Sequence, residues 1–508
     1  MTQIKKLSKK TIFRFHVIIC ILCLSSFGME AIAQPWTQLG QDINGEEIGD
    51  WFGGAVAINS GGDIIAVGAP SSDAMGTNAG QVIAYSWDGF TWSQRGNEIN
   101  GPFLFEQGGT SVSLDSSGNT LATAAPGNGV SGSDIGHIRI YSWNGSDWVQ
   151  KGVTIDGEHT NDISGTSISL SADGNILAIG APQNQDNGQT AGHVRLYSWD
   201  GNAWLQKGTD IDGEATGDRF GRSVSLSSDG NAVAIGAYGN GSSDAGHARV
   251  YIWDGNDWAQ KGIDLDGEDN FNLSGFSVSI DALGNTIAIG APDNAANGFR
   301  AGHVRIYSWN GSAWVQKGID LDGLEDDQLG WTVSISSSGN VVACGARGNG
   351  QFDPNNYEGY VKVYTWDGSL WTPTGSTIDQ NTFGVLSTGI SSNGNTLVLG
   401  IPVKDGPIPN TTYAGKARVY QFDTDLGITD LNFENEVTLY PNPTNGKFKV
   451  HGITGELKIY TVLGELIYTQ NKVDEETFID ISNQSNGIFF LNIKDDQHTV
   501  TVKVLIQK

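Results

Sequence analysis

The sequence predicts an all-β protein: a seven-bladed β-propeller of four-stranded blades, closed by an N-terminal strand and followed by a small C-terminal β-sandwich. Seventy of the 508 residues are glycine, about twice the usual share. Self-similarity at a fixed period is typical of repeat architectures. A Gly-Ala-Pro-like triplet recurs every 54–56 residues, starting at Gly68, Ala124, Gly180, Gly236, Gly290, Gly345 and Gly400. A Tyr-x-Trp-Asp/Asn-Gly motif follows at Tyr85, Tyr141, Tyr197, Tyr251, Tyr307 and Tyr364, with a degenerate copy at Tyr420.

Each repeat is expected to form four antiparallel strands, as the third repeat illustrates. Asp173-Gly174 lies between alternating apolar residues, which is a strong hairpin signal. No segment has the apolar period of a helix. Strands are therefore expected at residues 167–170, 176–180, 193–199 and 204–211. A close backbone approach is expected at the glycine that opens the first strand of each repeat, namely Gly53, Gly109, Gly165, Gly221, Gly275, Gly330 and Gly384.

The two ends of the repeat region predict how the ring closes. A Trp-x-Gln-x-Gly motif marks the fourth strand, and its copy at Trp36 precedes the first complete repeat. The last repeat runs to Phe422 without such a strand after it. Residues 36–43 are therefore expected to supply the outer strand of the last blade, so that the ring has no open sheet edge.

The repeats resemble a known family. Phe-Gly pairs open several of them, as at Phe52, Phe220 and Phe383, and Gly-Ala-Pro follows an apolar strand. This pattern is similar to the FG-GAP repeat, which forms the propeller of integrin α subunits and of many bacterial surface proteins. The resemblance covers about residues 36–423 and implies the propeller fold, a scaffold that hosts many functions.

The repeats depart from this family at one point. FG-GAP repeats often carry an Asp-x-Asp-x-Asp-Gly calcium loop between the first two strands. The corresponding turn here, residues 171–175, reads Ser-Ala-Asp-Gly-Asn and offers too few oxygen ligands for calcium. We therefore expect a plain hairpin and no cofactor, with calcium left possible. No catalytic, cofactor-binding or metal residue is assigned.

The N-terminal 33 residues read as a secretory signal peptide. Lys5, Lys6 and Arg14 belong to a basic region, an apolar stretch follows, and Ala31-Ile32-Ala33 provides a cleavage signal. A membrane anchor is the alternative, but the apolar run is short for a span. The expected organisation is a signal peptide at 1–33, a propeller at 34–423, a linker at 424–436 and a C-terminal domain at 437–508.

The C-terminal domain has its own pattern and its own resemblance. From Val437 the glycine content falls, and alternating strands are expected at residues 457–460, 464–468, 487–491 and 500–507. The Tyr440-Pro-Asn-Pro opening, the Gly487-Ile-Phe-Phe segment and the basic end at Lys508 resemble the type A C-terminal sorting domain of the type IX secretion system. The resemblance implies passage across the outer membrane by that machinery as a partner. A purely structural accessory domain is the alternative.

Composition excludes several partners. A formal charge of -27 argues against nucleic acid and anionic membranes, which need clustered Lys and Arg. Only Cys344 lies outside the expected signal peptide, so no intrachain disulfide is expected after its removal. The mature protein is expected to be secreted or on the outer cell surface, without a membrane span.

Histidines recur at one repeat position, each with an arginine two residues later. Equivalent positions on adjacent blades should lie more than roughly 10 Å apart, too far for one zinc ion to be shared. We therefore favour structural hydrogen bonding over a metal ring. The pairs are His137 and Arg139, His193 and Arg195, His247 and Arg249, and His303 and Arg305, whereas the other blades carry Gln81, Tyr360 and Lys416.

Acidic residues recur between the fourth strand and the next blade. They are expected on the same end of the ring as the loops after Gly-Ala-Pro, where cations or sugar hydroxyls have access, although a solvated turn is the plainer interpretation. They are Asp210 and Asp212, Asp264 and Asp266, and Asp320 and Asp322, with Glu158, Glu214 and Glu268 after the Asp-Gly.

Recognition is expected in the loops that differ between blades, such as residues 184–190 and 348–357. The repeated Tyr and Trp are assigned to blade packing. With no catalytic constellation, the sequence predicts a non-catalytic binding or adhesion protein for a protein or carbohydrate ligand. The alternatives are an extracellular polysaccharide lyase or hydrolase, and a structural envelope or matrix protein.

Overall fold

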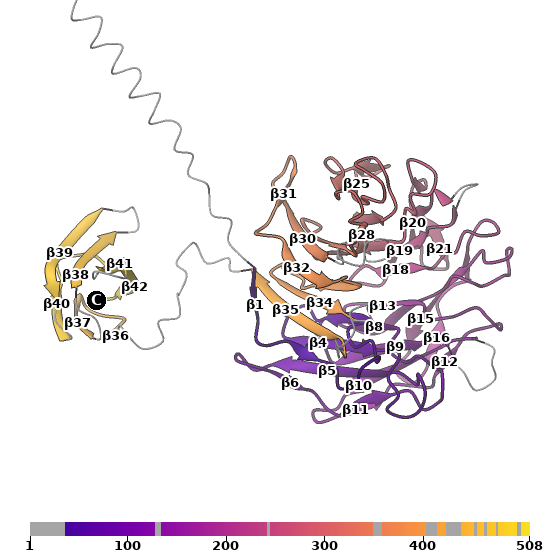
Figure 1. The fold of residues 1–508 in the computed structure, drawn as a ribbon, viewed down its shortest axis with the longest axis horizontal. Coiled ribbons are helices and arrows are strands. Elements are labelled where there is room, and N and C mark those ends of the chain that lie inside the picture. The colour runs from indigo at the N-terminus through magenta and orange to yellow at the C-terminus, as the bar shows by residue number, and fades with distance from the viewer. Residues whose placement is uncertain are drawn as a thin grey trace, which may run out of the picture. The chain divides into compact units, whose positions relative to one another are not determined.

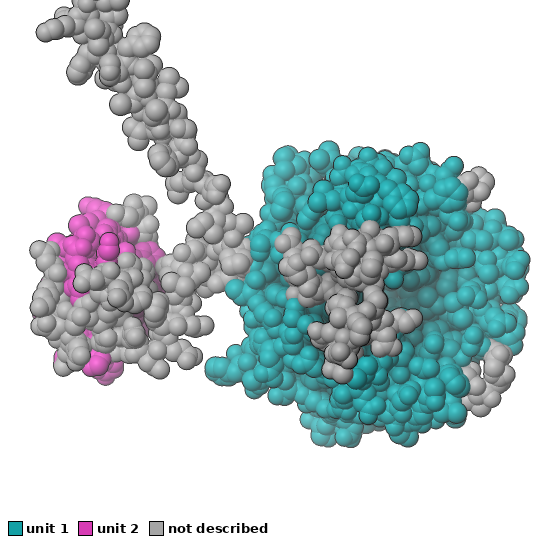
Figure 2. Space-filling view, in the orientation of Figure 1, with its two compact units in different colours: residues 1–423 teal, residues 424–508 magenta. Residues whose placement is uncertain are grey.

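A computed structural model describes residues 36–127, 134–240, 244–348, 358–402, 414–422, 438–451, 455–461, 465–473, 476–494 and 499–508. The chain divides into two compact units, residues 1–423 and 424–508 (Figure 2). All the elements in the described residues are β-strands, and the labelled strands of the first unit are arranged around a ring (Figure 1). The expected signal peptide, 1–33, and the expected linker, 424–436, lie outside the described residues.

The described residues of the first unit form seven antiparallel sheets, which we number in chain order. Six of them have four consecutive strands paired in chain order, and each of the seven also has a two- to six-residue strand that pairs with the third strand of its repeat. Sheets 1–3 comprise β3 (Ala55–Ile58), β4 (Ile64–Ala69), β5 (Gln81–Trp87), β6 (Trp92–Gln94) and β7 (Ile99–Asn100); β8 (Ser111–Leu114), β9 (Thr120–Ala125), β10 (His137–Trp143), β11 (Trp148–Gln150) and β12 (Ile155–Asp156); and β13 (Ser167–Leu170), β14 (Ile176–Ala181), β15 (His193–Trp199), β16 (Trp204–Gln206) and β17 (Ile211–Asp212).

The same plan continues through the later repeats. Sheets 4–6 comprise β18 (Ser223–Leu226), β19 (Ala232–Ala237), β20 (His247–Trp253), β21 (Trp258–Gln260) and β22 (Leu265–Asp266); β23 (Ser277–Ile280), β24 (Thr286–Ala291), β25 (His303–Trp309), β26 (Trp314–Gln316) and β27 (Leu321–Asp322); and β28 (Leu329–Ile335), β29 (Val341–Ala346), β30 (Glu358–Trp366), β31 (Trp371–Pro373) and β32 (Ile378–Phe383).

The seventh sheet joins the two ends of the ring. It contains β33 (Ser387–Ile390), β34 (Thr396–Ile401) and β35 (Lys416–Phe422), with β1 (Trp36–Gln38) and β2 (Ile43–Asn44) paired to β35. Trp36 lies opposite Phe422, and Figure 1 shows β1 beside β35. The predicted all-β fold and its N-terminal strand closure are confirmed.

The fourth strand differs from the single segment 204–211 that the sequence predicts. It is interrupted between β16 and β17, and both pieces pair with β15. Lys207 still donates its backbone N–H to Leu196, over 2.7 Å. Gly208 then takes a positive φ of 83°, a conformation that other residues rarely adopt. The chain therefore leaves the sheet here and returns at Ile211.

The innermost strands meet around the axis through serine hydroxyls. Ser169 of sheet 3 accepts the backbone N–H of Leu226 in sheet 4, over 3.0 Å. Equivalent bonds join other neighbouring sheets, for example Ser113 to Leu170 and Ser225 to Ile280. These bonds explain why serine alternates with apolar residues in the first strand of sheets 2 to 5.

A ring of backbone hydrogen bonds closes one end of the axis. Each N–H donates to the carbonyl of the equivalent residue in the next sheet, over 2.9–3.3 Å, and the seventh bond returns to the first residue. A cavity of about 150 Å³ lies at this end and is lined from all seven sheets. The ring runs through Ser60, Ser116, Ala172, Ser228, Ala282, Ser337 and Ser392.

The second unit is a small sandwich of two antiparallel sheets around a core that includes Phe448, Leu457 and Leu491. One sheet contains β36 (Thr438–Tyr440), β37 (Lys447–His451) and β40 (Glu476–Asp480), and the other β38 (Gly455–Thr461), β39 (Leu466–Val473), β41 (Gly487–Lys494) and β42 (Thr499–Ile506). The four expected strands correspond to β38, β39, β41 and β42, whereas the three-stranded sheet was not predicted.

Candidate functional site

The loops after each second strand and the loops between sheets gather at one end of the propeller, which we call the loop face. In sheet 3, the Asn187 side chain donates to the carbonyl of Gly213 over 2.6 Å, and Thr190 accepts the N–H of Arg219 over 3.0 Å. The two kinds of loop therefore lie at the same end of the ring, as the sequence predicts, and contact each other. The other expected loop, 348–357, lies almost wholly outside the described residues.

On the loop face, three of the four recurring histidines meet two of the recurring acids. His193 opens β15, Asp210 precedes β17 in the same sheet, and Glu158 follows β12 of the preceding sheet. The Nδ1 of His193 lies 3.7 Å from Asp210 Oδ2 and 3.9 Å from Glu158 Oε2. The group therefore spans the junction of two sheets.

The repeat produces this arrangement three times. In each copy the three ligand-type atoms lie within 4.8 Å of one another, and the histidine is buried between partly exposed carboxylates. We call these the His–acid groups of sheets 3, 4 and 5: Glu158, His193 and Asp210; Glu214, His247 and Asp264; and Glu268, His303 and Asp320. The sequence analysis found each residue type but did not connect them, because pairing within a sheet and contact between sheets are both needed.

Burial controls the protonation of these histidines. Each side chain is 1% exposed. Burial, helped by the neighbouring Arg305, lowers the pKa of His303 to about 4, and the pKa values of His193 and His247 are lowered for the same reasons. The imidazoles are thus neutral at neutral pH. Burial also raises the pKa of Glu158, with a further contribution from the charge of Asp210.

The expected structural hydrogen bonds form at the arginines, where Arg195 and Arg305 donate to backbone carbonyls and Arg249 donates to Asp264, but not at the histidine nitrogens that face the carboxylates. Neither ring nitrogen of His193 or His247, nor Nδ1 of His303, has a hydrogen-bond partner among the described residues. In contrast, His137 contacts the buried carboxylate of Glu106, which comes from the loop before β8. The histidine at this repeat position therefore lies in two different environments, one with a direct carboxylate contact and one without.

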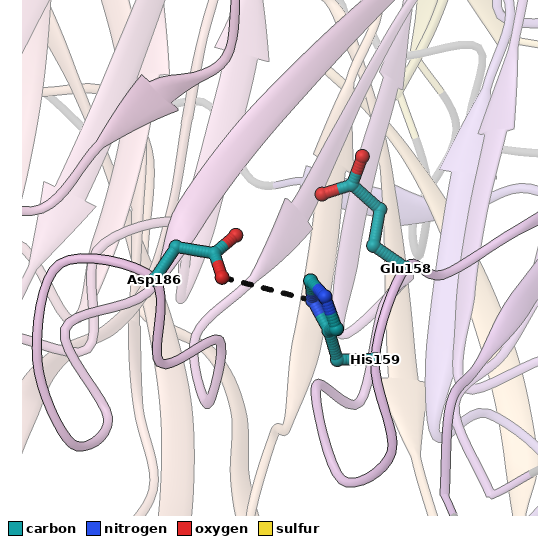
Figure 3. A group of neighbouring side chains, drawn as sticks. All are labelled: Glu158, His159 and Asp186. Atoms are coloured by element: carbon teal, nitrogen blue, oxygen red, sulfur yellow. Dashed lines mark ion pairs between the residues drawn. The ribbon is translucent and has the colours of Figure 1, made fainter.

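A second, exposed group adjoins the one in sheet 3. His159, next to Glu158 in the chain, has its Nδ1 3.7 Å from Asp186 Oδ1 and 3.8 Å from Asp162 Oδ2. Figure 3 shows Asp186 pointing across to His159 from a separate loop, with Glu158 beside it. The side chain of His159 is 62% exposed. Sheets 4 and 5 carry Ala215 and Asp269 at this position, so sheet 3 has the most ligand-type side chains.

The turns at the position of the FG-GAP calcium loop form hydrogen bonds between their own residues. The Asp173 carboxylate accepts the hydroxyl of Ser171 over 2.5 Å and the backbone N–H of Asn175 over 3.0 Å. These turns lie at the end of the propeller opposite the loop face. They form hairpins as the sequence predicts.

The repeated aromatic residues pack between neighbouring sheets. The Trp204 indole donates to the carbonyl of Lys151 in the preceding sheet over 2.9 Å, and the Lys151 ammonium lies 5.4 Å from the centroid of Trp199. Tyr251 packs edge-on against Phe220 at the start of the same repeat, with centroids 6.3 Å apart, and Phe220 donates its backbone N–H to Ala191 of the preceding sheet over 2.9 Å. These contacts fix sheet to sheet, as expected for blade packing.

A further cluster lies where the loop face meets the axis, and the sequence analysis did not identify it. Phe276 and Trp331 pack against each other with centroids 4.6 Å apart and ring planes tilted by 46°. The guanidinium of Arg222 lies 4.6 Å from the Phe276 centroid, and that of Arg347 lies 4.4 Å from the Trp331 centroid. Tyr238 packs against Phe276 at 5.6 Å. We call these five residues the axial cluster.

The arginines of the axial cluster have no carboxylate partner among the described residues. Arg222 and Arg347 are half-buried, and burial lowers the pKa of both guanidinium groups. Arg219 extends the cluster outward, because its guanidinium contacts the Tyr238 hydroxyl. The result is a concentration of positive charge and aromatic surface in an otherwise acidic protein.

The sequence does contain a signal for this cluster, because its members break the repeat. Tyr238 and Arg347 replace the proline of the Gly-Ala-Pro triplet. Arg222, Phe276 and Trp331 occupy a position that is threonine in sheets 2 and 3, at Thr110 and Thr166. Departures from the repeat at structurally equivalent positions locate the cluster, whereas the search for shared motifs overlooked it.

Two family models match the chain. Residues 206–252 match the FG-GAP repeat, and residues 438–507 match the secretion system C-terminal sorting domain. Both resemblances drawn from the sequence are thereby confirmed. The sorting domain indicates export by the type IX secretion machinery to the cell surface or the extracellular space. No curated protein matches the chain.

The described residues contain no helix long and apolar enough to cross a lipid bilayer.

Proposed function

We propose that this protein is an exported binding protein whose propeller recognises a carbohydrate that carries carboxylate groups. The axial cluster is the observation that carries the proposal. It combines arginines that have no carboxylate partner among the described residues with closely packed aromatic rings on the loop face, at positions where three neighbouring sheets depart from the repeat.

The chemistry of the cluster fits such a ligand. An arginine guanidinium presents a planar fork of donors that matches the geometry of a carboxylate. An aromatic face, with its negative quadrupole, attracts the C–H groups of a sugar ring. Arg222 and Phe276 provide one such pair and Arg347 and Trp331 the next. The cluster is therefore suited to two successive acidic sugar units.

The charge distribution supports local rather than general attraction. With a formal charge of -27, most of the surface repels a polyanion. Binding then depends on the place where positive charge is concentrated, and removing one arginine there has a large effect.

Catalysis is a second candidate, favoured by one contact. Arg219 contacts the hydroxyl of Tyr238 beside the cluster. In a polysaccharide lyase, a base removes the proton from the carbon next to a carboxylate. A tyrosine oxygen beside guanidinium groups is suited to the role of that base. We favour binding, because the stacked residues hold the ligand without such a step.

Binding to acidic polysaccharides tests the proposal. Isothermal titration would compare polygalacturonate and alginate with the neutral polymer dextran. We expect the protein to bind an acidic polymer but not dextran. Arg222→Thr and Trp331→Thr, which introduce the threonine of the equivalent positions, should each weaken binding at least tenfold. Lys503→Thr, a change of the same charge in the second unit, should leave it unchanged.

Two outcomes would reject parts of this picture. The proposal fails if no acidic polymer binds, or if both threonine variants bind as tightly as the unaltered protein. Release of an unsaturated product, detected by its ultraviolet absorbance and lost in Tyr238→Phe, would replace binding with lyase activity.

A further inference from the structure

The repeat position that carries histidine in four sheets is present in all seven sheets, so the contacts of the residue at this position can be compared between sheets. In four sheets the residue reaches a carboxylate directly. Gln81 donates to Glu98 over 2.7 Å, Lys416 lies 3.2 Å from Asp42, His137 contacts Glu106, and Tyr360 donates to Asp327. The three His–acid groups are different, because their histidine Nδ1 atoms stay 3.7–3.9 Å from the nearest carboxylate oxygens.

These separations are too long for hydrogen bonds, but they suit a shared metal ion. Around a zinc ion bound at about 2.0–2.2 Å, the ligand atoms of a tetrahedron lie about 3.4 Å apart. In sheet 3, the distances from His193 Nδ1 to Asp210 Oδ2 and to Glu158 Oε2, 3.7 and 3.9 Å, exceed that spacing by only a few tenths of an ångström, and the ligand-type atoms of the group all lie within 4.8 Å of one another. One nitrogen and two carboxylate oxygens are also a donor set that zinc accepts.

The buried histidine is the second observation that points to a ligand. His193 is 1% exposed, its Nδ1 faces the two carboxylates, and neither nitrogen has a hydrogen-bond partner among the described residues. Burying an imidazole without a partner is costly. A metal ion on Nδ1 would satisfy the nitrogen that faces the acids.

The three groups differ in what their arginine does. In sheet 4, Arg249 donates to both oxygens of Asp264, over 2.9 and 2.7 Å, and also contacts Glu214. Both carboxylates of that group are therefore already in contact with one guanidinium, which a metal ion would have to displace.

The arginines of sheets 3 and 5 are turned away from the aspartates. Arg195 donates to the carbonyl of Asp156 over 2.7 Å, and Arg305 donates to that of Asp266 over 2.6 Å. Each approaches its glutamate only to 3.5 or 3.4 Å. The carboxylates of these two groups remain available on the side that faces the histidine.

We propose that the propeller binds two divalent transition-metal ions of the zinc class, one at Glu158, His193 and Asp210 and one at Glu268, His303 and Asp320. Each ion joins a glutamate from one sheet to a histidine and an aspartate from the next, and so ties neighbouring sheets together. Histidines of adjacent sheets do not need to lie close together in this arrangement, because each ion binds only one histidine. Partial exposure of the glutamate and aspartate, 32% and 25% in sheet 3, provides the route of entry.

The test is metal stoichiometry on the whole exported protein. After treatment with a chelator and its removal, zinc would be titrated calorimetrically, and cobalt would report nitrogen and oxygen ligands by its visible spectrum. We expect two saturable sites per chain. His193→Gln and His303→Gln should each remove one site and the double variant both, with glutamine tolerated because Gln81 occupies this position in sheet 1.

His247→Gln is the matched control, since Arg249 closes its group, and it should leave two sites. Circular dichroism of each variant would verify the fold. The proposal is overturned if neither zinc nor cobalt binds saturably, or if binding survives in the double variant, which would assign it to exposed groups such as His159. A third site that disappears in His247→Gln would overturn the role given to Arg249.

Discussion

Arg418 and Asp42 form a bidentate ion pair: Nε of Arg418 donates to Oδ1 over 2.7 Å, and a terminal guanidinium nitrogen donates to Oδ2 over 2.9 Å. The two residues are 376 positions apart in the chain. Asp42 lies between β1 and β2, and Arg418 lies in β35. The pair therefore locks the N-terminal strands onto the last sheet.

We expect Asp42→Asn to destabilise the propeller. The amide cannot neutralise Arg418 and keeps only one acceptor oxygen, so the loss should be about 1–3 kcal/mol. Equilibrium denaturation of the unaltered and variant proteins would measure it. Thr37→Ala, a change of an exposed side chain on the same N-terminal segment, serves as the control. Equal stability of all three proteins would show that the ion pair does not hold the ring closed.

The contribution of this pair should depend on pH. The hydrogen bonds from Arg418 hold the pKa of Asp42 well below its usual value near 3.8. Stabilisation by a group with a lowered folded-state pKa is complete above its unfolded-state pKa and is lost as the pH falls toward the folded-state pKa. The stability difference between the unaltered protein and Asp42→Asn should therefore be constant from pH 8 to about 5 and shrink below about 4. A difference that grows on acidification would contradict this assignment.

Gly180→Ala should damage the contact between sheets 3 and 4. A Cβ at Gly180 would lie 2.0 Å from the carbonyl oxygen of Gly221, so the backbones would have to separate. The expected cost is on the order of 2–3 kcal/mol in thermal or denaturant unfolding. Gly61→Ala is the control, because its nearest neighbour is the movable carboxylate of Asp63. Similar effects of the two substitutions would argue against close packing of the sheets.

Cys344 should resist thiol reagents in the folded protein. The side chain is completely buried in β29, and burial raises the pKa of its thiol far above its usual value. Since the thiolate is the reactive form, labelling with an aromatic disulfide should begin only when the protein unfolds. Ser312→Cys, in an exposed turn, should react at once. Rapid reaction of Cys344 below the unfolding transition would show that sheet 6 opens locally.

Much of the fold follows from the sequence, because the same pattern of strands and turns recurs in seven repeats. Asp173-Gly174 predicts a hairpin, the copy of the tryptophan motif at Trp36 predicts ring closure, and Gly221 predicts close backbone approach. All three depend on local conformation or on comparison between repeats. The break between β16 and β17 was missed, since a glycine at position 208 of the sequence is compatible with either a continuing strand or the positive φ that ends it here.

The candidate sites depended on the tertiary structure. The sequence by itself determined strands, turns, closure and the C-terminal sorting domain, because each depends on adjacent residues or on their recurrence. It placed His193 in one pattern and Asp210 and Glu158 in another, and it treated Tyr238 and Arg347 as imperfect copies of a motif. Only the packing of one sheet against the next decided that the first three share a junction and that the other two meet at the axis. The physical reason is that side-chain proximity across sheets is set by radial stacking, which brings together residues that are far apart in the chain.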